Sequence, residues 1–396
     1  MEAQRMIGET RYSIGFLLDV LTENHENFGN REKESEIEKV EETLISKDRG
    51  FGSNIYSVKL TSAEGKAYSV VCKIPTAQHL NDHLQICNSG SKSFSEEEVR
   101  VQKEINITQV IETHNREVDF YRFAKKKFPR SLKIPRFIYG KYMSETKEGI
   151  AIMEDLSGKF EKGPSSAFSK TEALTMVDSI CELQVQCLLN QDFVERNFRP
   201  VESLVKCIKG FTLLAVDDLL KNENYTWFTQ DHADKISALA DFDKLLEVMA
   251  SMLELGMPPV VCHGDLWPTN ILWQSSGNGS RDLLAIIDWQ DCYIGNYATD
   301  LASILAVNMD FEMRKLCEKE ILEYYVDRMN AYKENYNLNI DLTYEKVHLA
   351  YKKALQVSVL LIMSLLGNPE DVVDYGDGMG RLTRRLMHML EDVEYE

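Results

Sequence analysis

The run of residues 260–290 constrains the fold of this chain more than any other feature of the sequence. It begins with an apolar stretch and continues through the loop His-Gly-Asp-Leu-Trp-Pro-Thr-Asn at 263–270. A second short apolar stretch, a glycine-rich turn and a third apolar stretch follow, and the run reaches Asp288. Short apolar runs on either side of a glycine-rich turn predict a β-hairpin. Such a hairpin would place Asn270 and Asp288 side by side, with Asp265 close by on the loop.

The side chains that this hairpin gathers suit phosphoryl transfer. Mg²⁺ prefers oxygen ligands, which the amide of Asn270 and the carboxylate of Asp288 supply. The reaction also needs a carboxylate that accepts the proton of an incoming hydroxyl group. Asp265 precedes Asn270 by the Asp-x-x-x-x-Asn spacing of protein-kinase catalytic loops. The ordered set, more than any single residue, predicts a phosphotransferase.

Two glycines in the N-terminal region, Gly50 and Gly52, precede a predicted strand at 54–60. Glycine lets backbone amides approach phosphates closely, because no side chain stands in the way. A single Gly-x-Gly is also typical of a plain hairpin turn. A phosphate-binding loop and a simple turn therefore both remain open at this position.

A lysine and a glutamate in the same region fit the nucleotide half of a phosphotransferase site. Lys73 lies near the end of a predicted strand at 67–74, in the place of the phosphate-pairing lysine of kinases. Glu117 lies in a segment with helical apolar spacing at 111–128 and could hold Lys73 extended. Either residue alone would be read as a solvated surface charge. Together with the downstream motifs, they predict a nucleotide-binding pair.

The predicted secondary structure changes from mixed strands and helices to mostly helices near residues 154–157. Residues 1–155 combine an N-terminal amphipathic helix with several strand-like segments and one long helix. Residues 156–396 are mostly helical by apolar spacing, apart from the β-like island at 259–290. We therefore expect an α+β fold with two lobes: a small mixed β-sheet lobe at 1–155 and a larger, mainly helical lobe at 156–396.

Charge and cysteine content limit the classes of partner and the cellular compartment that we expect. Lys plus Arg number 45 and Asp plus Glu number 63, which gives a net charge of −18. This sign argues against nucleic-acid and anionic-membrane partners, because both need a basic surface. The eight cysteines include no Cys-x-x-Cys pair, as expected for free thiols in a reducing compartment. The sequence has no signal-peptide pattern and no apolar run long enough to span a bilayer, so we expect a cytoplasmic protein.

Four motifs carry a resemblance to a known group of enzymes. They are HGDLWPTN at 263–270, IIDWQ at 286–290, AIMEDL at 151–156 and TDLASIL at 299–305. The set resembles the aminoglycoside phosphotransferase and choline kinase group, whose fold is protein-kinase-like. Within that group the chain is most similar to the CHK kinase-like branch, also called ecdysteroid kinase-like, and there to a nematode family of unknown function. The resemblance covers about residues 35–330.

The resemblance implies a role for each matching position. Asp265 would be the catalytic base, and Asn270 and Asp288 would be the Mg²⁺ ligands. Lys73 would contact the α- and β-phosphates of ATP and be oriented by Glu117. The hinge whose backbone meets the adenine would include Met153, Glu154 and Leu156. The apolar residues that sandwich the adenine would be Val58, Val71, Leu272 and Ile287.

The chain also departs from the protein-kinase pattern. Gly264 stands where protein kinases have the arginine of His-Arg-Asp, and Trp289 with Gln290 stands where they have Phe-Gly. These departures argue against activation by phosphorylation of a loop. They favour a small molecule over a protein as the acceptor. Two nearby residues have structural interpretations: His263 as a hydrogen-bonding brace of the loop, and Asp300 as the N-cap of a helix at 300–308.

The sequence therefore predicts an ATP- and Mg²⁺-dependent enzyme that O-phosphorylates a small-molecule alcohol. Steroid, choline-like and xenobiotic alcohols all fit the resemblance. The alternative is a pseudokinase, which would bind nucleotide or act as a scaffold without transferring phosphate. A metal hydrolase that uses His263, Asp265 and Asp288 is a weaker rival, because it lacks the second histidine cluster that such sites need.

Overall fold

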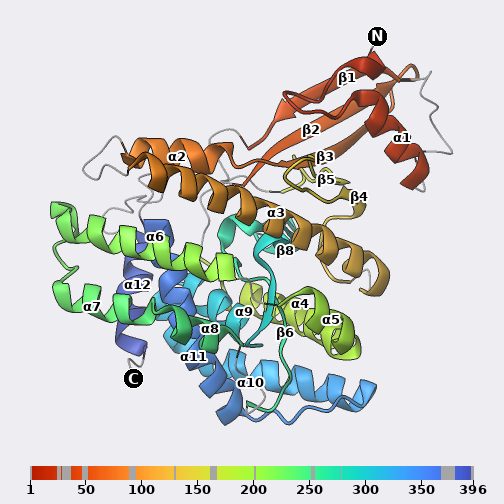
Figure 1. The fold of residues 1–396 in the computed structure, drawn as a ribbon. Helices are drawn as coiled ribbons and strands as arrows, with labels where there is room; N and C mark the ends of the chain where they lie inside the picture. The colour runs from red at the N-terminus through yellow and green to blue at the C-terminus, as the bar shows by residue number, and fades with distance from the viewer. Residues whose placement is uncertain are drawn as a thin grey trace. The chain divides into compact units, whose positions relative to one another are not determined.

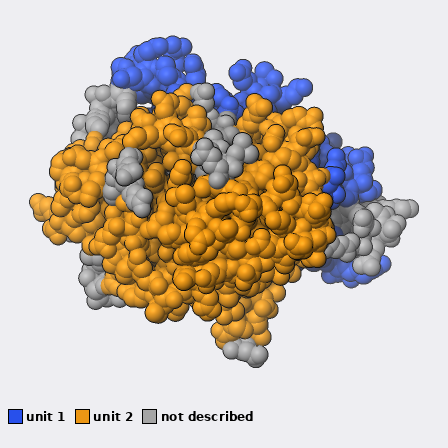
Figure 2. Space-filling model, turned by 90° about the horizontal axis from the view of Figure 1, so that it is seen from below, with its two compact units in different colours: residues 1–127, 134–160 blue, residues 128–133, 161–396 orange. Residues whose placement is uncertain are grey.

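A computed structural model describes residues 2–24, 28, 37–46, 52–88, 95–128, 131–160, 167–199, 202–250, 255–277, 279–366 and 380–393. The chain divides into two compact units, which Figure 2 distinguishes by colour. The N-terminal unit consists of residues 1–127 and 134–160, and the C-terminal unit consists of residues 128–133 and 161–396. The division after residue 160 lies close to the predicted boundary at 155, but the inclusion of 128–133 in the C-terminal unit was not expected.

The N-terminal unit is built on a five-stranded antiparallel sheet with the strand order β1-β2-β3-β5-β4. Its elements are η1 (Glu2–Gln4), α1 (Ile14–Asn24), β1 (Ile37–Leu44), β2 (Ser53–Ser62), β3 (Ala67–Pro75), α2 (Gln78–Asn88), α3 (Glu96–Lys127), β4 (Phe137–Lys141) and β5 (Ile150–Glu154). The strands predicted at 54–60 and 67–74 correspond to β2 and β3. The helix predicted at 111–128 is the C-terminal part of the longer α3.

Different helices cover the two faces of this sheet (Figure 1). On one face, Leu17 of α1 and Val70 of β3 belong to one buried apolar core. On the other face, Tyr121 of α3 stacks on Phe137 of β4 with ring centroids 5.5 Å apart. Since side chains alternate between faces along a strand, each strand residue belongs either to the α1 side or to the α3 side.

The long helix α3 is well specified at both ends. Ser95 and Glu98 form a reciprocal cap, because the N–H of each residue donates to the side chain of the other, at 2.8 and 3.2 Å. The first turn carries three glutamates and the last turn three lysines, which complement the helix dipole. These local signals account for where a helix with many polar residues begins and ends.

The C-terminal unit is mainly helical. Its elements are α4 (Lys170–Leu189), α5 (Gln191–Asn197), α6 (Glu202–Lys221), η3 (Glu223–Tyr225), α7 (Gln230–Leu239), α8 (Phe242–Ala250), β6 (Val260–Cys262), η5 (Pro268–Asn270), β7 (Ile271–Ser275), β8 (Arg281–Ile286), η6 (Trp289–Asp291), β9 (Tyr293–Gly295), α9 (Thr299–Ala302), the π-helical η7 (Ser303–Val307), α10 (Phe311–Tyr336), α11 (Tyr344–Leu366) and α12 (Arg381–Asp392). In this unit α4 packs against α10, and α11 packs against α6 and α9.

Two small antiparallel pairs, β6–β9 and β7–β8, form the β-like island of this unit. The backbone N–H of Ile286 on β8 also donates to the carbonyl of Lys133 at 2.8 Å. This bond attaches the segment 128–133 to the hairpin, which explains why that segment belongs to the C-terminal unit. The α+β fold class expected from the sequence, with a sheet-bearing first unit and a mainly helical second unit, is confirmed. In the described part of the chain, no helix is long and apolar enough to cross a membrane.

Candidate active site

The lysine and the glutamate of the N-terminal unit form a buried ion pair. Lys73 Nζ lies 2.8 Å from Glu117 Oε2, and the two side chains are 7% and 1% exposed. Lys73 comes from β3 and Glu117 from α3, so the pair ties the sheet to the helix. Withdrawing two charges from water is costly, and close pairing is needed to offset that cost. The structure thus brings together the two residues that the sequence analysis paired.

Lys73→Ala is expected to destabilise the N-terminal unit by about 3–5 kcal/mol, because it leaves the carboxylate of Glu117 buried without its lysine. The double variant Lys73→Met with Glu117→Leu should recover most of this loss, since it removes both charges of the pair. Urea unfolding of the parent and of these variants measures both effects. Equal unfolding midpoints for Lys73→Ala and the parent would contradict the prediction.

A buried histidine lies one turn before Glu117 on α3. His114 Nε2 donates to the carbonyl oxygen of Lys141 at 2.9 Å. Burial lowers the pKa of His114 from 6.5 to about 4; the bond to Lys141 opposes this shift, and the positive charge of Lys73 adds to it. His114 is therefore neutral at physiological pH and does not compete with Lys73 for Glu117.

Acid is expected to destabilise the N-terminal unit through His114. Between pH 6.5 and 4 the unfolded chain takes up a proton that the folded histidine does not, so stability that is present above pH 6.5 is lost as the pH falls toward 4. The full shift corresponds to about 3 kcal/mol. His114→Gln keeps a donor for the carbonyl of Lys141 but does not titrate, so its unfolding free energy should fall less steeply over this interval. Urea unfolding at several pH values measures the slope, and parallel slopes for variant and parent would disprove it.

The strand register defines the sheet face that carries Lys73. Lys73 is paired with Ile55 on β2, and Val71 is paired with Ser57 on β2 and with Met153 on β5. Directly paired residues point to the same face of an antiparallel sheet. Val71 and Met153, both predicted to contact the nucleotide, therefore lie on the same face as Lys73.

Val58 was predicted to contact the adenine, and the register corrects this. Val58 is paired with Val70, so it points to the face opposite Lys73, and it is fully buried in the core that includes α1. The neighbouring Ser57 lies on the Lys73 face instead, where its hydroxyl donates to the carboxylate of Asp155 at 2.5 Å. The sequence contains the signal for this correction. Side chains on one face of a hairpin alternate every two residues, and from Lys73 this alternation reaches Ser57 and not Val58.

The predicted hinge, residues 153–156, spans the end of β5. The N–H of Glu154 donates to the carbonyl of Arg136 at 3.0 Å, and its carboxylate accepts from the N–H of Arg136 at 2.8 Å. Leu156 is buried, and its carbonyl accepts from the N–H of Lys159 at 3.0 Å. These bonds fix the course of the segment after β5. Its contact with adenine stays a prediction.

Of the two glycines before β2, Gly50 lies outside the described residues. The carbonyl of Gly52 accepts from the N–H of Thr76 at 2.9 Å, which continues the β2–β3 ladder beyond its terminal pair. The backbone of Gly52 is therefore fixed at the open end of the hairpin. A contact of either glycine with phosphate stays a prediction.

In the C-terminal unit, the loop after β6 holds Asp265 in place. The side-chain amide of Asn270 donates to both the carbonyl and the carboxylate Oδ2 of Asp265, each at 2.9 Å. The backbone tightens the same loop: the N–H of Trp267 donates to the carbonyl of Asp265 at 3.1 Å, and the N–H of Asn270 to that of Trp267 at 3.0 Å. The spacing of five positions between Asp265 and Asn270 is therefore the length of one compact turn that lets their side chains meet.

The hairpin β7–β8 brings Asp288 close to Asn270. Ile271 pairs with Ile286, and the N–H of Ile287 donates to the carbonyl of Asn270 at 2.9 Å. Asp288 follows directly in a left-handed conformation with φ 64° and ψ 60°, which aspartate and asparagine tolerate better than most residues. The predicted neighbourhood of Asn270 and Asp288 agrees with this geometry. Ile287 is half-buried at this end of the hairpin, and Leu272 is buried within it.

His263 links the loop to the end of the hairpin. Its Nε2 donates to the carbonyl of Ile287 at 2.9 Å, and its Nδ1 accepts from the N–H of Asp265 at 3.2 Å. The ring also packs against Trp289, with centroids 4.5 Å apart, and the indole N–H of Trp289 donates to the carbonyl of Ile286 at 3.1 Å. These contacts agree with the bracing role expected for His263.

The geometry explains the glycine that replaces the arginine of protein kinases. Gly264 has φ +81°, and a Cβ atom there would lie 2.6 Å from the carbonyl oxygen of Asp291. Any other residue would therefore be strained in its backbone and would collide with the segment after Asp288.

Asp300 has a role that the sequence analysis missed. Its buried carboxylate accepts from the N–H groups of His263, at 2.8 Å, and Gly264, at 3.4 Å. The predicted capping role is wrong, because α9 begins at Thr299 and its N-cap residue is Ala298. Burial raises the pKa of Asp300 to about 6, against the effect of the two N–H donors. The signal in the sequence was an acidic residue among apolar neighbours of a helix, because such a residue needs a buried partner.

The donors at this site suit a magnesium ion. Asn270 donates its side-chain N–H groups to Asp265, so its amide oxygen is the atom that could bind a metal ion, and Asp288 could add a carboxylate. Mg²⁺ that carries substrate phosphates needs only one or two protein carboxylates, because phosphate and water oxygens complete the octahedron. In the described residues, no group of three or more His, Cys, Asp or Glu side chains gathers as a metal cluster.

Comparison with known proteins identifies two relatives in Caenorhabditis elegans. The first, named "Uncharacterized oxidoreductase dhs-27", is 24% identical over 336 residues, which cover 81% of this chain and 39% of the relative. The second, an uncharacterized kinase-like protein, is 23% identical over 287 residues, which cover 71% of each chain. The chain thus spans about two fifths of the length of the first relative.

Among solved structures, a GDP complex of an aminoglycoside 2'-phosphotransferase is similar to this chain with a TM-score of 0.45, at 12% identity and with 96% of each chain covered. The DUF1679 family model, described as "Uncharacterized oxidoreductase dhs-27", matches residues 17–395. Because this match extends over nearly the whole sequence, the chain belongs to the DUF1679 family.

Proposed function

We propose that this protein is an ATP-dependent phosphotransferase that phosphorylates the hydroxyl group of a small-molecule alcohol. The observation that carries the proposal is the contact of Asn270 with Asp265 at the end of the hairpin that presents Asp288. In this proposal the turn 265–270 and the adjoining end of the hairpin supply a proton acceptor and two oxygen ligands for a metal ion. Phosphoryl transfer depends mostly on positioning and charge stabilisation, which such a turn supplies.

The residues of the turn, of the hairpin end and of the supporting segments have distinct roles in the proposal. The carboxylate of Asp265 orients the acceptor hydroxyl and takes its proton as the new oxygen–phosphorus bond forms. The amide oxygen of Asn270 and the carboxylate of Asp288 hold Mg²⁺. When bound, the ion neutralises charge on the phosphate oxygens. Asp300 and His263 position the backbone of the loop and are not proposed to contact the reactants.

The nucleotide contacts come from the N-terminal unit and from the hairpin. Lys73, held extended by Glu117, pairs with phosphate oxygens as a desolvated cation. Val71 and Met153 contact the adenine from the Lys73 face of the sheet, and the backbone of 153–156 recognises its edge. The other adenine and phosphate contacts are proposed at Gly50, Gly52, Leu272 and Ile287. Val58 is excluded from this set by its position on the opposite face.

The finer assignment to the CHK kinase-like branch rests on the four sequence motifs. It favours a steroid, choline-like or xenobiotic alcohol as the acceptor. The oxidoreductase named in the family description is a longer protein, of which this chain covers 39%. We therefore attribute kinase chemistry, and not redox chemistry, to the segment of that relative that matches this chain.

A phosphorylation screen tests the proposal. The purified protein is incubated with γ-labelled ATP, Mg²⁺ and panels of steroid, amino-alcohol and xenobiotic alcohols, beside the variant Asp265→Asn. Transfer of label to an alcohol by the parent, with little transfer by the variant, is the expected result. Nucleotide binding without transfer to any alcohol in the panels, or to a metabolite extract, would favour the pseudokinase instead.

A further inference from the structure

We propose that the C-terminal helix α12 positions the loop 263–270 through two residues, Arg385 and Asn308, which lie outside the predicted site. What the loop does rests on the proposed function, but the positioning itself does not. The inference comes from a continuous series of hydrogen bonds within the C-terminal unit. It runs from α12 to the end of η7, and from there to the residue next to Asp265.

Asn308 is the link to the loop. It is completely buried, and its side-chain amide donates to the carbonyl of Leu266 at 2.9 Å and to the carbonyl of Ser303 at 2.8 Å. Its backbone N–H donates to the same carbonyl of Ser303, at 3.1 Å, in the π-helical pattern of η7. Since Leu266 follows Asp265 directly, the position of the Asn308 side chain bears on the position of the catalytic carboxylate.

The loop is thus tied at two points to one continuous segment, α9 followed by η7. Asp300, near the start of this segment, accepts from the N–H groups of residues 263 and 264. Asn308, just after its end, donates to the carbonyl of residue 266. The two ties lie on either side of Asp265 in the sequence. A shift of this segment would therefore move the backbone on both sides of Asp265 together.

Arg385 connects this segment to α12. Its side chain is buried, and its guanidinium donates to the carbonyls of Val307 and Asn308 and, at 3.1 Å, to the carboxylate of Asp310. The last carbonyls of a helical segment have no partner within it and carry partial negative charge. A buried guanidinium with several donors satisfies them together. Arg385 therefore fixes the end of η7 from which Asn308 projects.

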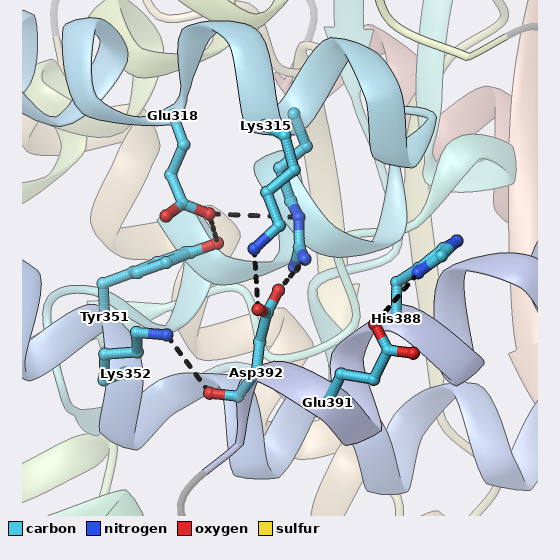
Figure 3. A network of polar contacts seen from close by, with 8 residues as sticks. Lys315, Glu318, Tyr351, Lys352, His388, Glu391 and Asp392 are labelled. Carbon is cyan, nitrogen blue, oxygen red and sulfur yellow. Dashed lines mark hydrogen bonds and ion pairs between the residues drawn. The ribbon is translucent and has the colours of Figure 1, made fainter.

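Polar contacts anchor the other end of α12 to α10 and α11 (Figure 3). The carboxylate of Asp392 pairs with Arg314 and, at 2.7 Å, with Lys315, both of α10. Lys352 of α11 donates to the backbone carbonyl of Asp392 at 3.1 Å. Because polar contacts hold α12 at both ends, small changes in its docking reach η7 through Arg385.

Hydrogen exchange tests this positioning without using enzymatic activity. Asn308→Ala removes the donor to the carbonyl of Leu266, and Arg385→Met removes the donors to η7 while keeping much of the apolar stem. Both should accelerate exchange in peptides that cover 263–272 by about 10-fold or more, because a buried hydrogen bond is lost. Arg384→Met, which changes the exposed neighbour on α12, is the matched control.

The pattern of exchange distinguishes positioning from general destabilisation. Peptides from β8 and from α4 should exchange as in the parent, whereas general destabilisation would accelerate them equally. Asp392→Asn, a milder change at the far end of α12, should accelerate loop exchange in the same direction but by less. Unchanged loop exchange in Asn308→Ala and Arg385→Met, or equal acceleration in every peptide, would overturn the proposal. These exchange rates do not depend on phosphate transfer. They therefore test the positioning of the loop even if the proposed function is wrong.

Discussion

Asp265→Asn is expected to lower kcat for alcohol phosphorylation by at least about 10²-fold, because the amide cannot take the proton of the acceptor hydroxyl. The substitution changes little else. An asparagine at 265 keeps an oxygen that accepts from the side-chain amide of Asn270, so the turn should hold its shape. ATP affinity should stay nearly constant, since the proposed role of this side chain concerns the acceptor and not the adenine.

Measurement of kcat and of ATP affinity on the same variant distinguishes two roles of Asp265, as a general base or as a structural support of the loop. If Asp265 served only to hold the loop, asparagine would preserve most of that bonding and most of the activity. A kcat within a few-fold of the parent would therefore remove the base role. A loss of both kcat and ATP affinity would instead indicate that the substitution disturbs the nucleotide site.

Asp288→Asn is expected to reduce Mg²⁺-dependent activity by orders of magnitude, because it removes the anionic ligand of a hard cation. Asparagine is suited to the test, since it tolerates the left-handed conformation of residue 288 nearly as well as aspartate does. The variant should therefore unfold at a temperature close to that of the parent. Raising the Mg²⁺ concentration should restore part of the lost rate.

Asp282→Asn is the matched control for this variant. It makes the same chemical change on β8 of the same hairpin, but at an exposed position. Titration of activity with Mg²⁺ for the parent and both variants gives the comparison. Near-normal activity of Asp288→Asn at limiting Mg²⁺ would show that Asp288 is not a ligand.

Sequence reasoning performed best where the relevant partners are close in the chain. The hairpin and the turn from Asp265 to Asn270 depend on apolar alternation, a glycine-rich turn and a short loop, all of which are local signals. Lys73 and Glu117 are more distant, but a lysine in a buried strand needs a carboxylate, and α3 offers one on the covered face. These features could be predicted because neighbouring residues limit the choices strongly.

The errors arose where a residue's role depends on orientation. Val58 has the composition expected of an adenine contact, but its register places it with α1. Asp300 stands near a helix start, as an N-cap would, but its carboxylate bonds to a loop far away in sequence. For Val58 a one-residue offset in the strand decides which face the side chain meets. Asp300 lies two residues past the N-cap Ala298, and its residue type does not reveal that position.

By itself the sequence determined the α+β class, the hairpin that carries Asn270 and Asp288, and the chemical character of the proposed site, because periodicity, turns and ligand chemistry are properties of short segments. Only the tertiary structure decided which face of the sheet each strand residue occupies, that Asp300 and Asn308 tie down the loop around Asp265, and that Arg385 of α12 fixes the segment that carries them. The physical reason is that buried polar groups must find partners, and packing chooses those partners among elements far apart in the chain.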